Sequence, residues 1–173
     1  PSVEEFLEPG GPRKARKIEI SDLLSRPEVK LDKKVCRYLV GKTILVTGGG
    51  GSIGSEICMQ VARYNPKTIV VFDIYENCAF ELENDLIDKY DDQIDVQVRI
   101  GSVRDVDRLR EIFSEFKPDV VFHAAAHKHV PLMEDSPCEA VKNNVFGTYN
   151  VAKMADEFKV PKMVILSTDK AVN

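Results

Sequence analysis

The sequence predicts an α/β fold built on a doubly wound parallel sheet. Two observations support this prediction: short apolar runs rich in β-branched residues recur along the chain, and segments with a helical spacing of apolar residues separate them. Four of the runs are apolar on both faces, as strands are when helices cover a parallel sheet on both sides. The runs are residues 43–46, 68–72, 96–100, 120–122 and 163–166, and the expected helices are residues 55–62, 79–90, 109–116 and 136–155.

The third run differs from the others, because Val96, Val98 and Ile100 alternate with Gln97 and Arg99. Alternation of this kind is typical of a half-buried strand, so the third strand is expected at an edge of the sheet. Since crossovers between parallel strands are right-handed, the expected strand order is 3-2-1-4-5.

The longest expected helix has the clearest start. Ser136 is predicted as its N-cap, with Pro137 in the first turn and Glu139 completing a capping box. Gly147 inside this helix costs about 1 kcal/mol relative to alanine. A close approach of another backbone or side chain at Gly147 would compensate for that cost.

The composition and charge of the chain exclude several classes of protein. The chain has 173 residues, of which 43% are hydrophobic, and this suits one globular domain with a core. A net charge of −4 without a sustained basic stripe argues against nucleic-acid binding, no apolar run is long enough to span a membrane, and no signal peptide is expected. No cysteines form a C-x-x-C pair, so free thiols in a reduced cytoplasmic compartment are expected. The cysteines are Cys36, Cys58, Cys78 and Cys138; Cys58 and Cys138, in expected helices, should behave as small hydrophobic residues.

Residues 1–40 differ from the rest of the chain. An acidic start, the Pro-Gly-Gly-Pro stretch at residues 9–12 and a short basic run at residues 13–17 indicate an arm or linker. The sheet domain is then expected to occupy residues 41–173.

The strongest local motif directly follows the first run. Gly48, Gly51 and Gly54 have the G-x-x-G-x-x-G spacing between a strand and a helix. The first would permit a tight turn, the second the approach of a pyrophosphate, and the third close packing of the helix. Free N–H groups of Ser52 and Ile53 at the helix N-terminus favour an anion. The loop therefore predicts a dinucleotide site in a Rossmann-type sheet.

Asp73 ends the second run, about 20 residues beyond the last glycine of the loop. A carboxylate at this place can accept hydrogen bonds from both ribose hydroxyls and would repel a 2′-phosphate. No arginine within residues 73–80 could receive such a phosphate. NAD is therefore favoured over NADP. Asp73 could also cap the following helix, a role compatible with the first.

Residues after the third and fourth runs are expected to complete the cofactor site. Ser102 and Val103 would border the adenine, whereas Asp105 is expected to cap the next helix. Three small residues after the fourth run would let the cofactor lie against the backbone, and these are Ala124, Ala125 and Ala126.

All three histidines fall within residues 123–129. They form no helical i, i+4 ligand pair, so no metal site is predicted. Because the segment follows a strand at the ligand-binding edge of the sheet, Lys128 and His129 are expected to project toward the occupant of the crevice, such as a diphosphate. Ordinary surface side chains are the alternative interpretation.

Four segments together resemble the extended short-chain dehydrogenase/reductase superfamily, and more narrowly the CapD-like nucleotide-sugar 4,6-dehydratases, which typically act on UDP-N-acetylglucosamine. The resemblance covers about residue 18 to the end of the chain. Its most specific parts are the strings His-Lys-His-Val-Pro and Thr-Asp-Lys. The four segments are residues 47–54, 123–131, 141–148 and 167–173.

The resemblance implies a redox-neutral lyase of surface polysaccharide biosynthesis. NAD takes a hydride from C4 of the sugar, water leaves across C5 and C6, and the hydride returns to C6. In the family's pattern Asp169 would protonate the departing C6 hydroxyl, Lys170 would remove the C5 proton and Thr168 would hydrogen-bond near the C4 oxygen. From the residues alone, these three could equally be a polar exit from the last strand.

Members of the family continue past Asn173 with a lysine-bearing segment of the dehydrogenase site and a substrate domain. The chain is therefore expected to be the NAD-binding part of the enzyme, with a sheet truncated after about five strands, and to be inactive by itself. The full-length protein is expected to be a cytoplasmic homo-oligomer, and the resemblance also allows anchoring to the inner face of the membrane. Two alternatives remain: a non-catalytic dinucleotide-sensing module, and a nucleotide-sugar epimerase or reductase, which needs no acid/base pair after the fifth strand.

Overall fold

The structure is a computed structural model that describes residues 35–167. The chain divides into two units, residues 1–32 and 33–173, and the described residues belong to the second. Most of the expected arm and the segment Thr168, Asp169 and Lys170 lie outside the described residues. The described part begins with a short 3₁₀ helix, η2 (Val35–Leu39), whose Leu39 is buried in the core.

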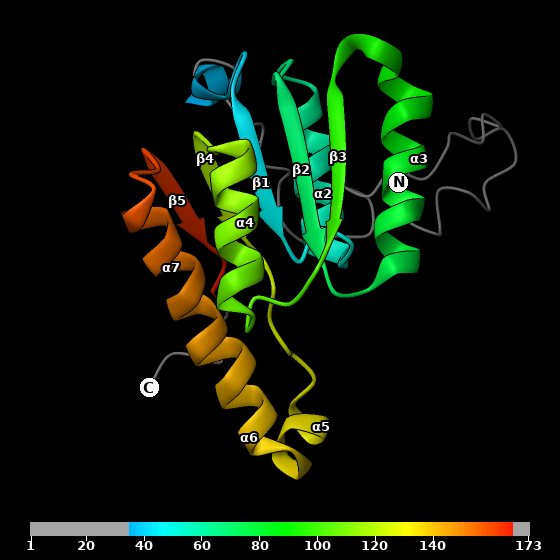
Figure 1. Ribbon diagram of the computed structural model, residues 1–173. Coiled ribbons are helices and arrows are strands. Elements are labelled where there is room, and N and C mark those ends of the chain that lie inside the picture. Colours follow the sequence, from blue (N-terminus) through cyan, green and yellow to red (C-terminus); the bar gives the residue numbers. More distant parts are fainter. Residues whose placement is uncertain (1–34, 168–173) are drawn as a thin grey trace, which may run out of the picture. The chain divides into compact units, whose positions relative to one another are not determined.

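Five parallel strands form one sheet in the order β3-β2-β1-β4-β5 (Figure 1). The predicted fold class and strand order are thereby confirmed. As predicted, β3 lies at an edge and is only partly buried. The strands are β1 (Thr43–Thr47), β2 (Thr68–Asp73), β3 (Asp95–Ile100), β4 (Val120–His123) and β5 (Lys162–Ile165).

Helices cover both faces of the sheet (Figure 1). On one face α2 (Ser52–Ala62) packs on β1 and α3 (Glu76–Tyr90) packs on β2 and β3, and both helices share a core cluster with Ile44 and Val46 of β1. On the other, α4 (Val106–Phe116) and α7 (Thr148–Glu157) pack around Leu45. Successive residues of β1 thus enter opposite halves of the core, which explains why the consecutive residues Ile44, Leu45 and Val46 are all apolar. Each such side chain contributes about 1.5–3 kcal/mol by its burial.

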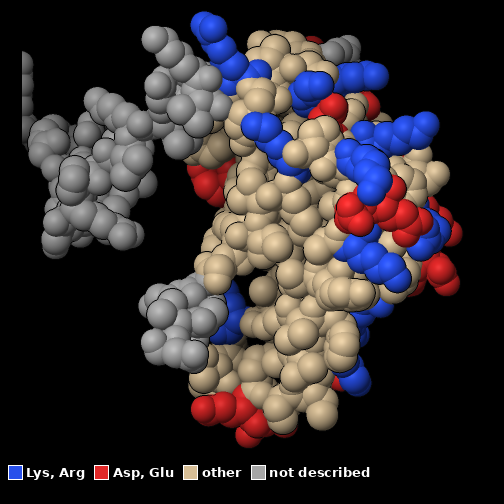
Figure 2. Space-filling view, turned by 90° about the vertical axis from the view of Figure 1, so that its left-hand side faces the viewer, with Lys and Arg blue, Asp and Glu red and all other residues tan. Residues whose placement is uncertain are grey.

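The fifth strand is more exposed than the sequence predicted. Val164 and Ile165 are 41% and 49% exposed, although both faces of β5 were expected to be covered. Within residues 35–167, β5 pairs only with β4, so one edge of the strand has no neighbour. Figure 2 views the molecule from the side of β5 and α7, and the centre of this view carries few charged side chains.

The predicted helix over residues 136–155 is present as one continuous helical run over residues 137–157, but its middle is π-helical, which the sequence did not indicate. The structure has a four-residue helix α6 (Pro137–Ala140), a π-helical segment η4 (Val141–Gly147) and then α7. A further short helix, α5 (Val130–Asp135), precedes them and was not predicted. Cys138 on α6 is exposed rather than packed as a small hydrophobic residue, whereas Cys58 on α2 is buried as expected.

The predicted capping box is absent. The side chain of Ser136 makes no capping hydrogen bond, and its backbone has φ −133° and ψ 56°. The carboxylate of Glu139 instead pairs with Arg104 and Lys142. The Glu139 carboxylate is therefore engaged by two cationic side chains instead of the backbone at Ser136.

Gly147 has the compensating contact that the sequence suggested. A Cβ at this position would lie 2.6 Å from Cγ2 of Val103, a buried side chain. We therefore expect Gly147→Ala to lower the free energy of unfolding by about 1–3 kcal/mol, because valine is stiff and cannot yield. An exposed helix position would show the opposite sign, so Ser114→Ala on α4 is the matched control.

Chemical denaturation of the full chain measures this effect. The double variant Gly147→Ala/Val103→Ala should lose less stability than the sum of the two single variants, because the second change makes room for the new methyl group. An unchanged or higher stability of Gly147→Ala alone would show that the contact is not restrictive.

Candidate functional site

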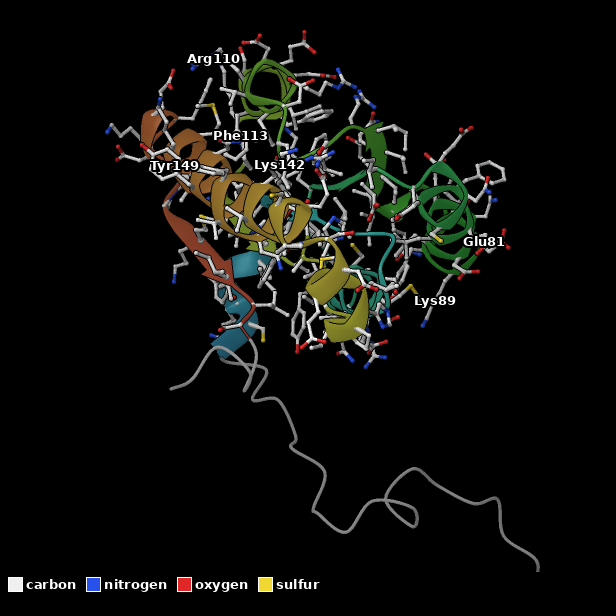
Figure 3. The ribbon with its side chains drawn as sticks, turned by 90° about the horizontal axis from the view of Figure 1, so that it is seen from below. Glu81, Lys89, Arg110, Phe113, Lys142 and Tyr149 are labelled. Carbon is white, nitrogen blue, oxygen red and sulfur yellow. The ribbon has the colours of Figure 1, made fainter. Side chains whose placement is uncertain are left out.

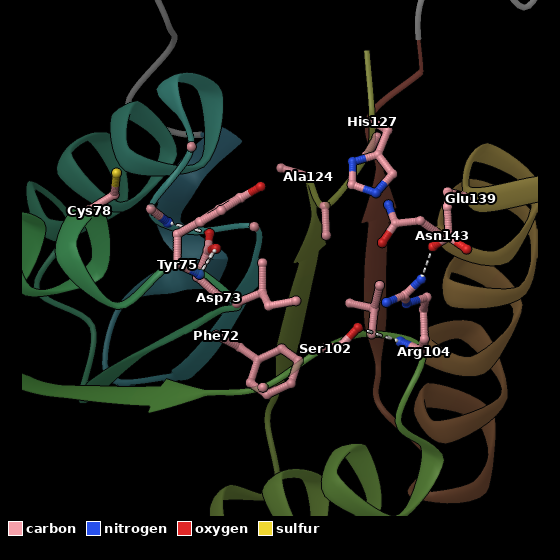
Figure 4. Close-up of a pocket in the computed structure, with 18 residues that line it drawn as sticks. Phe72, Asp73, Tyr75, Cys78, Ser102, Arg104, Ala124, His127, Glu139 and Asn143 are labelled. Carbon is pink, nitrogen blue, oxygen red and sulfur yellow. Dashed lines mark hydrogen bonds and ion pairs between the residues drawn. The ribbon is translucent and has the colours of Figure 1, made fainter. Parts of the chain in front are cut away.

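A cavity of about 340 Å³ lies at the carboxyl ends of the strands (Figure 4). Residues that follow β1, β2, β3 and β4 line it, together with two side chains of the α6–η4 helix, Glu139 and Asn143. Figure 3 views the molecule from this end, along the strands. In a parallel α/β sheet, this edge at the point where the strand order reverses is the usual place for a ligand.

The glycine loop is shaped by close approaches of the main chain. Gly48 has φ +70°, and a Cβ there would lie 2.6 Å from the backbone nitrogen of Ala125. A Cβ on Gly54 would collide with the carbonyl oxygen of Gly48. Both glycines are therefore required by the chain itself, as the sequence predicted for a turn and for helix packing.

Gly51 differs from these two glycines, because a Cβ there would meet only the Gly48 carbonyl oxygen, at 3.3 Å. It is the N-cap of α2 and has no side chain to satisfy the first N–H groups of the helix. Those N–H groups, which include Ser52 and Ile53, have no intrahelical partner and can receive an anion. The assignment of these residues to a pyrophosphate stays a prediction.

Asp73 joins the end of β2 to the glycine loop. Its side chain is buried, Oδ2 accepts a hydrogen bond from Gly50 N at 2.8 Å, and Oδ1 accepts one from Tyr75 N at 2.9 Å. It does not cap α3, whose N-cap is Tyr75. A carboxylate has about four acceptor positions, so both oxygens keep capacity for ribose hydroxyls.

The loop after β3, residues 101–104, lines part of the cavity. Ser102 Oγ accepts a hydrogen bond from Arg104 N at 3.2 Å, and Val103 is buried beneath Gly147. Asp105 caps α4 by accepting a hydrogen bond from Arg108 N at 3.0 Å, as predicted.

Arg104 and Glu139 also line the cavity, and the sequence did not indicate them (Figure 4). Hydrogen bonds from Lys142 and Arg104 hold the pKa of Glu139 below its usual value. A local signal was present, since Arg104 directly follows the predicted adenine-bordering residues. Its partner Glu139 was assigned to the capping box instead.

The three histidines have different surroundings. His123 is 3% exposed; its Nδ1 lies 2.6 Å from Thr47 Oγ1, and its Nε2 lies 2.8 Å from Thr148 Oγ1. Burial lowers its pKa to about 4. At neutral pH the ring is therefore uncharged, so one nitrogen donates and the other accepts. His123 ties β1, β4 and α7 together.

Ala124, Ala125 and Ala126 line the cavity, as does His127. Lys128 and His129 are exposed and follow this wall without being part of the cavity lining, so their predicted contact with a substrate stays a prediction. Within the described part of the chain, no group of three or more His, Cys, Asp or Glu side chains is placed to hold a metal ion. No helix among residues 35–167 has the length and apolar character needed to cross a bilayer.

The parallel sheet, the glycine loop after β1 and the acidic residue at the end of β2 define a Rossmann-like α/β domain. The family described as polysaccharide biosynthesis protein matches residues 44–173, and the chain belongs to this family.

Three curated relatives show what the chain is similar to. The capsular polysaccharide biosynthesis protein CapD of Staphylococcus aureus is 50% identical over 159 residues, which are 91% of this chain and 26% of that protein. The UDP-N-acetylglucosamine 4,6-dehydratase (inverting) of Campylobacter jejuni is 38% identical over 134 residues, 77% of this chain and 38% of that enzyme. A UDP-glucose 4-epimerase of Rickettsia bellii is 35% identical over 77% of this chain and 38% of its own length.

Two solved structures are similar to this chain in both fold and sequence. Pen from Bacillus thuringiensis has a TM-score of 0.71 and 38% identity, over 78% of this chain and 40% of that one. The Bordetella bronchiseptica enzyme WbmG in complex with NAD has a TM-score of 0.62 and 30% identity, over 74% of this chain and 38% of that one. The resemblance drawn from the sequence is thereby confirmed, and the chain spans 26% to 40% of the length of these proteins.

The buried His123 generates a prediction on pH dependence. Its folded pKa of about 4 lies below the unfolded value near 6.5, so the stability that the neutral ring confers is complete above about pH 6.5 and is lost as the pH falls toward 4. The loss from this one residue is about 3 kcal/mol.

Denaturation of the wild-type chain and His123→Asn from pH 7.5 to 4.5 measures this contribution, because the carboxylates contribute equally to both. The variant should show the shallower pH dependence. In the wild type, NMR signals of the His123 ring should not titrate above about pH 5. Equal pH slopes, or a ring that titrates near 6.5, would contradict the buried neutral state.

Proposed function

We propose that this chain is the NAD-binding portion of a nucleotide-sugar 4,6-dehydratase that acts on a substrate of the UDP-N-acetylglucosamine type in polysaccharide biosynthesis. The main observation in support of dinucleotide binding is the position of Asp73. Its carboxylate borders the cavity and accepts a hydrogen bond from Gly50 N, which supports one site for the ribose, at Asp73, and for the pyrophosphate, at the glycine loop.

The residues around the cavity fit NAD in chemistry. The N-terminus of α2 would receive the pyrophosphate, and Asp73 would accept hydrogen bonds from the ribose hydroxyls. Ser102 and Val103 would border the adenine. The alanines at residues 124–126 leave room beside the backbone, and the NAD complex of the similar enzyme WbmG supports the same cofactor.

The specific reaction is supported by the Campylobacter dehydratase and by the Thr-Asp-Lys string. NAD, when bound, would accept a hydride from C4 of the sugar and return it to C6. Asp169 would donate a proton to the departing C6 hydroxyl, Lys170 would accept the C5 proton, and Thr168 would hydrogen-bond to the C4 oxygen. These residues follow β5, which runs parallel to β4 and so ends at the edge of the sheet where the cavity lies.

Lys128 and His129 would contact the diphosphate of the nucleotide-sugar, since they follow the wall of the cavity at His127 and are exposed to solvent. A 4-epimerase is the second candidate function, because the Rickettsia epimerase is similar over nearly the same part of the chain. Both activities use the same NAD-binding part. They differ in whether an acid and a base after the fifth strand are needed.

Replacement of the acid and the base distinguishes these functions. In the full-length gene product, Asp169→Asn and Lys170→Met should each lower formation of the 4-keto-6-deoxy product by about 10²–10⁴-fold while NAD binding persists. The matched controls are Asp156→Asn and Lys159→Met, an exposed ion pair on the surface whose loss should leave turnover unchanged.

Product analysis by mass spectrometry and NMR reads out this experiment. Unchanged dehydration by either site variant would remove that residue from the proposed mechanism. A wild-type protein that forms only the C4 epimer of the substrate would favour the epimerase, and one that binds NAD without turning over any nucleotide-sugar would favour a sensing module.

A further inference from the structure

Asn144 makes two hydrogen bonds to the main chain of a single residue. Its Oδ1 accepts from His127 N at 2.8 Å, and its Nδ2 donates to His127 O at 2.8 Å. One partner can only donate and the other can only accept, so the orientation of the amide is defined. The side chain thus satisfies His127 as a neighbouring strand would.

This contact lies where the chain leaves the sheet. Residues 124–129 follow β4 and have no regular secondary structure. Ala124 N still donates to Thr47 O at 2.9 Å, and three residues later His127 is held by Asn144. The amide therefore continues the support of this segment beyond the sheet.

The π-helical segment η4 presents the residues that make this contact. Asn143 lines the cavity, its Nδ2 donates to Asn144 Oδ1 at 3.0 Å, and Thr148, next after η4, holds His123. Asn144 and Thr148, one turn apart on the same helical run, thus hold the chain at two points: at His123, the last residue of β4, and at His127. π-Helical turns inside α-helices are frequent at functional sites.

The segment held in this way forms a wall of the cavity. Ala124, Ala125, Ala126 and His127 all line it, whereas Asn144 does not. Figure 4 shows His127 and Asn143 on the side of the cavity opposite Asp73 and Tyr75. A shift of His127 would change the width of the space between these sides.

We propose that Asn144 is a positioning residue: its amide holds residues 124–127 in the course that forms one wall of the dinucleotide pocket, and it thereby sets the affinity for the cofactor without touching it. This inference rests on the proposed NAD-binding function. It concerns binding, so it does not depend on which sugar reaction follows.

Two variants of Asn144 separate its hydrogen bonds in the full chain. Asn144→Ala removes both, whereas Asn144→Asp keeps the acceptor for His127 N and loses the donor to His127 O. Asn84, exposed on α3, provides the matched controls Asn84→Ala and Asn84→Asp. Amide hydrogen exchange of the cofactor-free chain, thermal unfolding and titration with NAD are measured for all five proteins.

In Asn144→Ala the amide of His127 should exchange at least about tenfold faster, and NAD should bind roughly fivefold to tenfold more weakly, as expected for the loss of about one net hydrogen bond. Asn144→Asp should keep the protection of the His127 amide. Both Asn84 variants should match the wild type.

Unchanged exchange at His127 in Asn144→Ala would overturn the proposed brace, and faster exchange with unchanged NAD affinity would overturn its role in positioning. Faster exchange spread evenly over all strands would show a loss of general stability and overturn the local role. A wild-type chain that does not bind NAD would refute the proposed function instead, and the exchange at His127, which needs no cofactor, would still test the brace.

Discussion

The meeting of three main-chain segments at Gly48 is the contact on which the site depends. Gly48 N donates to Phe72 O at 2.8 Å, and a side chain on Gly48 would meet the backbone of Ala124 and Ala125. Gly54 packs the start of α2 onto the same residue. The exits of β1, β2 and β4 are therefore held in contact at one position, and the cavity opens beside it.

Side chains take over where the hydrogen bonds of the sheet end. Asp73 holds the glycine loop, His123 joins two threonines across β1 and α7, and Asn144 holds His127. Within the described residues, no buried side-chain polar atom lacks a hydrogen-bond partner. Since an unpaired buried polar group costs about 1–3 kcal/mol, these side-chain pairings stabilise the edge of the sheet.

Features set by local sequence were predictable. The glycine spacing, the cap at Asp105 and the strand order follow from short-range chemistry and from the rules for parallel sheets. The pairs Arg104–Glu139 and His127–Asn144 were not predictable, because their members lie 35 and 17 residues apart along the chain. Likewise, the spacing of the three histidines within residues 123–129 does not indicate that the first is buried. An apolar run also does not show whether a strand such as β5 has a neighbour on both sides.

The proposed selection of NAD by Asp73 can be measured by isothermal titration of the full chain with NAD and with NADP. The wild type should bind NAD at least about tenfold more tightly than NADP, because the 2′-phosphate would face a buried carboxylate. Asp73→Asn should reduce this preference, whereas Asp88→Asn, on the exposed face of α3, should leave it intact. Equal or tighter binding of NADP by the wild-type chain would show that Asp73 does not select NAD.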